Sequence, residues 1–159
     1  MEKPKTVLLV EDDENDIFFF RRALKKNALP FEVHVALDGG EAQDYLTGKG
    51  KFADRERFRF PDFIITDNKM PHVAGATFLK WLKEHPQFRV VPTILLSGSG
   101  QPSDVLNAYD SLGVHSYILK PNGSEDLAET IALIFKYWAR CLVPPTLPAN
   151  EQGQRGSTG

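Results

Sequence analysis

Residues that could carry out chemistry follow four apolar segments of this chain, at the point where each segment ends. A run of acids, of which the first two are candidates, follows residues 7–10, and a polar candidate follows each of 63–66, 93–96 and 117–119. In chain order these residues are Glu11 and Asp12, Asp67, Ser97, and Lys120. Because open α/β sheets bind ligands at the carboxyl ends of their strands, we expect these side chains to meet at one edge of a sheet.

The acids of this set favour a bound cation. Several carboxylates at one edge repel one another, and either proton uptake or a bound cation relieves that repulsion. Oxygen ligands without a cluster of histidines or thiolates favour a hard ion such as Mg²⁺. We therefore predict Asp12 and Asp67 as ligands, Glu11 as the holder of a metal-bound water, and the main-chain carbonyl of Lys69 as a further ligand.

The remaining members suit phosphoryl transfer. Lys120 supplies a fixed positive charge and Ser97 a hydroxyl donor, and both stabilise charge spread over a transferring phosphoryl group. A carboxylate can itself be the nucleophile and form an aspartyl phosphate, and Asp67 lies at the centre of the set.

Each of these residues alone also has an ordinary structural interpretation. A strand-end Asp can form a turn or cap a helix, and the acids from Glu11 to Asp16 can favour a helix dipole. Ser97 can be a loop hydroxyl and Lys120 a solvated charge. The combination at four strand ends favours one reaction over four coincidences.

The elements that must position this site alternate between short apolar runs and helical patterns, which predicts a parallel sheet with crossover helices. We predict strands at residues 5–10, 31–36, 62–66, 93–96 and 116–119. Helical spacing of apolar residues predicts helices at 14–26, from 38–40 through Leu46, at 74–84, weakly at 103–112, and at 124–142.

Two segments lie outside this pattern. Residues 48–61 are too charged for a core and too irregular for a helix or strand, so we predict a long surface loop. Residues 144–159 are rich in Pro, Gly and Ser, and we predict a disordered tail after one folded domain at 1–143.

Composition narrows the function classes. The 159 residues suit one ordinary core. A net charge of -2 gives no basic field for nucleic acid, so direct nucleic-acid binding is not expected. No run reaches the length of a membrane helix, the start lacks a secretory apolar stretch, and a lone Cys141 forms no internal disulfide, which together favour the cytoplasm.

The sequence closely resembles the receiver domain of bacterial two-component response regulators from about Lys5 to Leu142. The matching motifs are Val10-Glu11-Asp12, Ile64-Ile65-Thr66-Asp67-Asn68-Lys69-Met70-Pro71, Gly75, Ser97-Gly98 and Tyr117-Ile118-Leu119-Lys120-Pro121.

This resemblance implies a flavodoxin-like, doubly wound α/β fold of five parallel strands in the order 2-1-3-4-5. It implies that Asp67 accepts a phosphoryl group from a sensor histidine kinase, that Glu11 and Asp12 organise Mg²⁺, and that Lys120 bonds the phosphoryl group. It also assigns Ser97 as the switch hydroxyl and Tyr117 as the switch aromatic, and implies a cis peptide bond between Lys120 and Pro121.

Such a protein is a phosphoacceptor that assists its own phosphorylation and dephosphorylation, and it is not a classical enzyme. The long segment before the third strand and the missing output domain are similar to single-domain regulators paired with phytochrome-type kinases. The face built from the fourth helix, fifth strand and fifth helix would then signal to a downstream phosphorelay or effector protein. Lys69 and Asn122 depart from the usual pattern, and neither removes an essential group.

Two rival functions and one structural question stay open. A haloacid-dehalogenase-type phosphohydrolase also uses an Asp nucleophile with Mg²⁺, but it needs a second carboxylate where this chain has Lys69. A docking module that works without phosphate is the other rival. Leu133 and Tyr137 lie off the apolar stripe of the last helix, where they form either a homodimer seam or a half-exposed face.

Overall fold

Strands and helices alternate along the two stretches of chain, residues 4–67 and 75–145, that this computed structural model describes. The strands are β1 (Lys5–Val10), β2 (Phe31–Ala36), β3 (Phe63–Asp67), β4 (Thr93–Ser97) and β5 (Ser116–Leu119). The α-helices are α1 (Glu14–Lys26), α2 (Gly39–Thr47), α3 (Gly75–Glu84), α4 (Pro102–Asp110) and α5 (Ser124–Arg140). A short 3₁₀ helix, η1 (Gly50–Phe52), follows α2.

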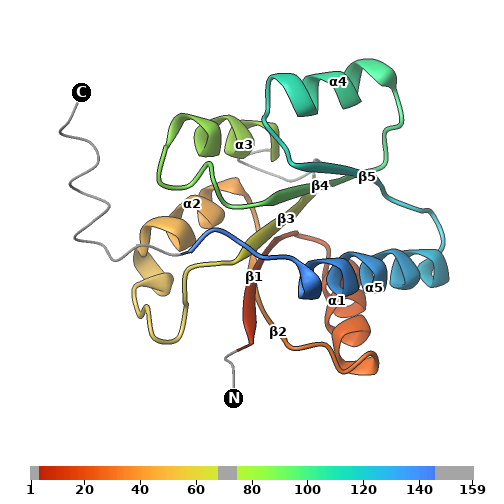
Figure 1. Cartoon of the computed structure of the whole chain (residues 1–159), viewed down its shortest axis with the longest axis horizontal. Helices are drawn as coiled ribbons and strands as arrows, with labels where there is room; N and C mark the ends of the chain where they lie inside the picture. The colour runs from red at the N-terminus through yellow and green to blue at the C-terminus, as the bar shows by residue number, and fades with distance from the viewer. Residues whose placement is uncertain (1–3, 68–74, 146–159) are drawn as a thin grey trace.

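The strands form one parallel sheet in the order β2-β1-β3-β4-β5, which confirms the predicted flavodoxin-like fold (Figure 1). Helices α1 and α5 cover one face, and α2, α3 and α4 lie on the other. Because both faces are covered, the central strands are buried on both sides and read as continuous apolar runs rather than as alternating patterns.

The observed ends of β3 and β4 change how the site residues are held. Asp67 and Ser97 are the last residues of their strands, one position further into the sheet than predicted. Strand pairing sets Asp67 opposite Leu96 and Ser97 opposite Leu119. Both side chains therefore start from backbone that the sheet fixes, rather than from a loop.

Helix α1 begins at a well-formed cap. The Asp13 side chain accepts hydrogen bonds from the main-chain N–H groups of Asn15 at 2.8 Å and Asp16 at 3.1 Å. Such a cap satisfies donors that the first helical turn leaves open. It also fixes the direction in which the first turn of α1 leaves the end of β1.

The segment 48–61 is packed more closely than its charge predicted. Phe52 of η1 is 3% exposed, and the half-buried Phe58 and Phe60 pack against the core, Phe58 on Tyr45 of α2 and Phe60 on Phe88. Arg55 donates to the main-chain oxygens of Tyr45 at 2.7 Å and Phe52 at 3.2 Å. The prediction of a surface loop was therefore wrong for its aromatic residues, which bury their rings wholly or in part, and for Arg55 and Arg59, which are half-buried. The other charged residues of the segment are exposed.

Some predictions fall outside the described residues. Lys69 and residues 146–159 of the predicted tail are among them. In the described part of the chain, no helix has both the length and the apolar character needed to cross a membrane.

Candidate functional site

A charged cluster lies where β1, β3 and β5 end. The ammonium of Lys120 is 3.5 Å from Oδ2 of Asp67 and 3.9 Å from Oε2 of Glu11. It also forms a close ion pair with Oδ2 of Asp16, from the first turn of α1. Three carboxylates and one ammonium thus meet at the sheet edge where the sequence predicted a site.

Glu11 is the most buried acid of the cluster, with a side chain that is 2% exposed. Burial raises the pKa of Glu11 to about 8, and the negative charge of Asp67 adds to this. The main-chain N–H of Asp13, which donates to Oε1 of Glu11 at 3.0 Å, and the positive charge of Lys120 oppose the increase. Burial of the carboxylate is thus the main reason why folded Glu11 binds its proton more tightly than an exposed glutamate does.

This shift predicts a pH-dependent stability for the metal-free protein. Unfolded Glu11 loses its proton near pH 4.5 and folded Glu11 near pH 8, so between these values the folded state holds the extra proton. The stabilising contribution is fully present below the unfolded pKa and is lost as pH rises toward the folded one, by at most about 1.4 kcal/mol per pH unit. Urea unfolding in a chelator between pH 5 and pH 8 measures it.

Glu11→Gln is the matched control for this prediction, because the amide keeps the shape and does not titrate. The free energy of unfolding of the variant minus that of the unsubstituted protein is expected to increase with pH over this range. A difference that stays flat would contradict the burial of an ionisable Glu11.

Lys120 keeps its proton firmly. Burial alone would lower the pKa of this ammonium, but the hydrogen bond to Asp16 and the charges of Asp67 and Glu11 raise it above its ordinary value. The main-chain N–H of Lys120 also donates to the main-chain oxygen of Ser97 at 2.7 Å. A permanent positive charge is thus fixed beside the Asp67 carboxylate.

The structure brings together most, but not all, of the predicted acids. Glu11, Asp16 and Asp67 offer carboxylate oxygens within 4.8 Å of one another, whereas Asp12 is exposed and is not part of this group. The role of Asp12 as a ligand stays a prediction. Asp16 was missed as a site residue because its place in the first turn of α1 was explained by the helix dipole alone.

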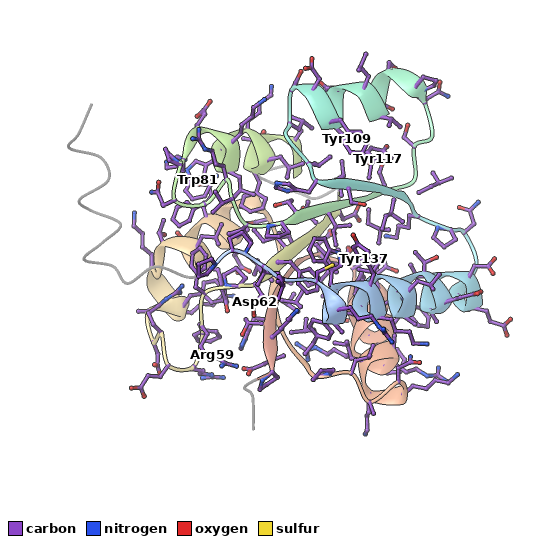
Figure 2. All side chains as sticks on the ribbon, in the orientation of Figure 1. Arg59, Asp62, Trp81, Tyr109, Tyr117 and Tyr137 are labelled. Atoms are coloured by element: carbon purple, nitrogen blue, oxygen red, sulfur yellow. The ribbon has the colours of Figure 1, made fainter. Side chains whose placement is uncertain are left out.

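Ser97 and Tyr117 are joined by hydrogen bonds through the residue after Gly98. Ser97 is 3% exposed, and its Oγ accepts from the main-chain N–H of Ser99 at 3.2 Å. The hydroxyl of Tyr117 donates to the main-chain oxygen of Ser99 at 2.5 Å. The hydroxyl of Tyr109, on α4, accepts from the main-chain N–H of Tyr117 at 3.0 Å, and Figure 2 labels both tyrosines between α4 and the sheet. The end of β4, α4 and β5 are thus connected.

The expected cis peptide bond between Lys120 and Pro121 is a wrong prediction for this structure. The described residues, which include both of these, contain no cis peptide bond. A peptide bond that precedes proline favours trans by about 0.5–1 kcal/mol. Lys120 contacts the three carboxylates with this bond in trans.

The donor set suits a hard divalent cation. Each of the three grouped acids can offer one oxygen atom, and the group contains no histidine or thiolate. Mg²⁺ is bound in proteins through one or two carboxylates, with water and phosphate oxygens as the remaining ligands. The group contains enough carboxylates for such a site: one follows β1, one ends β3 and one lies in the first turn of α1.

Comparisons with known proteins give one consistent family. A family model described as the response regulator receiver domain matches residues 7–132. Among curated proteins, the chain is 30% identical over 146 residues to response regulator Rcp1 of Synechocystis sp., which covers 92% of this chain and 95% of that protein.

Solved structures agree with the sequence match. The phosphorylated cyanobacterial phytochrome response regulator RcpA superposes with a TM-score of 0.81 at 31% identity, over 89% of this chain and 99% of that chain. The Mn²⁺-bound form of response regulator Rcp1 gives a TM-score of 0.80 at 28% identity, over 89% of this chain and 100% of that one.

Proposed function

Because the chain belongs to the response regulator receiver domain family, whose members are phosphoacceptor signalling modules, we propose that Asp67 accepts a phosphoryl group from a sensor histidine kinase. The observation that carries this proposal is the Lys120 ammonium 3.5 Å from Oδ2 of Asp67, on an edge where Glu11 is also buried. A nucleophilic carboxylate and a fixed cation are two of the groups that support acceptance of a phosphoryl group.

In the proposed transfer, an Oδ atom of Asp67 attacks phosphorus as the bond from phosphorus to the kinase histidine nitrogen breaks. The nitrogen leaves with the bonding electron pair, and the product is an acyl phosphate on Asp67. Lys120 stays protonated, so it attracts the phosphoryl oxygens throughout. The residues that would hold Mg²⁺ are Asp12, Asp67 and the Lys69 carbonyl as ligands, with Glu11 bound through a metal-bound water. The ion would neutralise charge on the carboxylates and phosphoryl oxygens.

The signal would leave through the surface formed by α4, β5 and α5. In our proposal the Ser97 hydroxyl turns toward the phosphoryl oxygens, which changes the hydrogen bond that its Oγ accepts from Ser99. Ser99 also accepts from Tyr117, so the change reaches β5. The hydroxyl of Tyr109 accepts from the main-chain N–H of Tyr117, so a change at Tyr117 also reaches α4. Two arrangements of such a network, one favoured by phosphate, would make a switch.

The proposed partners are a histidine kinase before this protein and a phosphorelay or effector protein after it. A kinase of the phytochrome type is our more specific proposal, because the similar RcpA is a phytochrome response regulator. The match covers 99% of RcpA and 95% of Rcp1, so the similarity extends over nearly the whole of these two proteins.

A small phosphodonor tests the proposal without knowledge of the kinase. Incubation of the protein with acetyl phosphate and Mg²⁺ is expected to add the mass of one phosphoryl group, in a form that hydroxylamine removes. A parallel assay with small phosphate esters is expected to show no turnover, which separates a phosphoacceptor from a phosphohydrolase. An unmodified protein under conditions that label a known receiver would refute the proposal.

A dimer seam on α5 stays a prediction. Leu133 and Tyr137 are 62% and 65% exposed, so the sequence placed them correctly off the buried stripe. If they form a seam, Leu133→Glu is expected to lower the dimer fraction in analytical ultracentrifugation, because burial of a charge opposes association. Val90→Glu, at a residue 51% exposed in the turn before β4, is the control. Equal effects of both variants, or a monomer at all concentrations, would exclude the seam.

A further inference from the structure

Asp16 is the acid that lies closest to Lys120, although the proposed chemistry takes place on Asp67. The Lys120 ammonium forms its shortest ion pair with Oδ2 of Asp16, and Oδ2 of Asp67 is 3.5 Å away. The side chains of Asp16 and Lys120 are 15% and 22% exposed, so water screens this pair only in part. The ammonium is therefore displaced to the α1 side of the phosphoacceptor.

Both partners of this pair are anchored by their own backbone. The main-chain N–H of Asp16 donates to the cap residue Asp13, which fixes the first turn of α1. The main-chain N–H of Lys120 donates to Ser97 at the end of β4. Because both main chains are fixed, the position of the ammonium among the three carboxylates depends on the conformation of the flexible lysine side chain.

Without Asp16, the position of lowest energy for the Lys120 ammonium would be different. The ammonium would lie between the oxygens of Asp67 and Glu11, its two other partners. These are the oxygens that suit a divalent cation, so the ammonium and the cation would compete for them.

From this geometry, and on the basis of the proposed function, we propose that Asp16 is a positioning residue. It holds Lys120 on the side of α1 and so weakens the competition between the ammonium and a divalent cation for the oxygens of Asp67 and Glu11. The ammonium remains close enough to contact a phosphoryl group once Asp67 carries one.

A helix-dipole role does not account for this arrangement. Glu14 also lies in the first turn of α1 and supplies the same charge there, but it is exposed. Asp16 alone of these two acids has a carboxylate in the cluster with Glu11 and Asp67. Glu14 therefore offers a control that changes the helix charge without changing the Lys120 ion pair.

The test is Mg²⁺ binding to the unphosphorylated protein, measured by isothermal titration calorimetry. Asp16→Asn is expected to raise the dissociation constant about tenfold, because Lys120 then moves onto Asp67 and Glu11. Glu14→Gln is expected to change it less than about twofold, because an exposed charge is screened. Urea unfolding of each variant verifies that it is folded at the titration temperature.

A double-mutant cycle separates this role from direct coordination of the metal by Asp16. If Asp16 acts through Lys120, then Asp16→Asn is expected to have little effect in a Lys120→Gln background, which itself binds Mg²⁺ more tightly than the unsubstituted protein. An equal loss of affinity in both backgrounds would make Asp16 a metal ligand and overturn the proposal, as would equal effects of Asp16→Asn and Glu14→Gln. Because no phosphoryl group is present, this result is independent of whether Asp67 accepts one.

Discussion

Replacing Asp67 with asparagine is expected to abolish phosphoryl incorporation from acetyl phosphate. The amount incorporated should fall to the background seen with a protein that has no phosphoacceptor. The amide keeps the size of the side chain at the end of β3 but removes the charged oxygen that would attack phosphorus. It also removes one of the carboxylates 3.5–3.9 Å from Lys120, so Mg²⁺ binding weakens as well. Intact-mass spectrometry measures the loss.

Glu14→Gln is the matched control, because it makes the same change of acid to amide at an exposed residue of α1. This variant is expected to accept a phosphoryl group as the unsubstituted protein does. Reduction of the phosphorylated protein with borohydride converts an aspartyl phosphate into homoserine, which sequencing by mass spectrometry then locates. Labelling that persists in Asp67→Asn, or homoserine at another position, would remove Asp67 from its proposed role. Unchanged signalling by Asp67→Asn would favour a docking module that works without phosphate.

Replacing Phe52 with alanine is expected to lower the free energy of unfolding by about 3–5 kcal/mol. Phe52 is 3% exposed, and its ring centroid lies 5.1 Å from that of Tyr45 and 5.2 Å from that of Phe58. The loss combines the removal of a buried ring with the cavity left between two other aromatic side chains. The midpoint and slope of urea unfolding measure it.

Phe18→Ala is the control for this second variant. Phe18 lies on α1 and is 58% exposed, so the same substitution removes little buried surface there and introduces a better helix former. We expect its stability to stay within about 0.5 kcal/mol of the unsubstituted protein. Similar losses for both phenylalanines would mean that segment 48–61 contributes no more to the core than an exposed helix face does.

The sequence was sufficient to predict the order of the strands and helices and the edge where the site lies. Strand and helix boundaries came within about two residues, because the apolar runs of the central strands and the helical spacing of α1 and α5 are unambiguous. The packing of segment 48–61 could not be read in this way. Its rings are interspersed with charged residues at no regular period, and only their contacts with Tyr45 of α2 and with Phe88 reveal that they face inward.

The charged cluster shows a similar limit. Glu11, Asp67 and Lys120 were predictable because each is the first charge after an apolar run. Asp16 was not, because its contact with Lys120 joins residues 104 positions apart and depends on the direction that the cap at Asp13 gives to α1. Charge pattern identifies the acids near an edge, and only three-dimensional placement shows which of them reaches the ammonium.

The first strand and the last helix are joined directly. The Lys5 ammonium donates to the main-chain oxygens of Trp138 at 2.9 Å and Cys141 at 2.7 Å. Leu127, Ile131, Ile134 and Phe135 of α5 complete the apolar layer that β1 and α1 begin. During synthesis, this half of the core therefore stays open to water until α5 has emerged from the ribosome. A nascent chain that stalls before residue 124 would present that unfinished layer to chaperones and proteases.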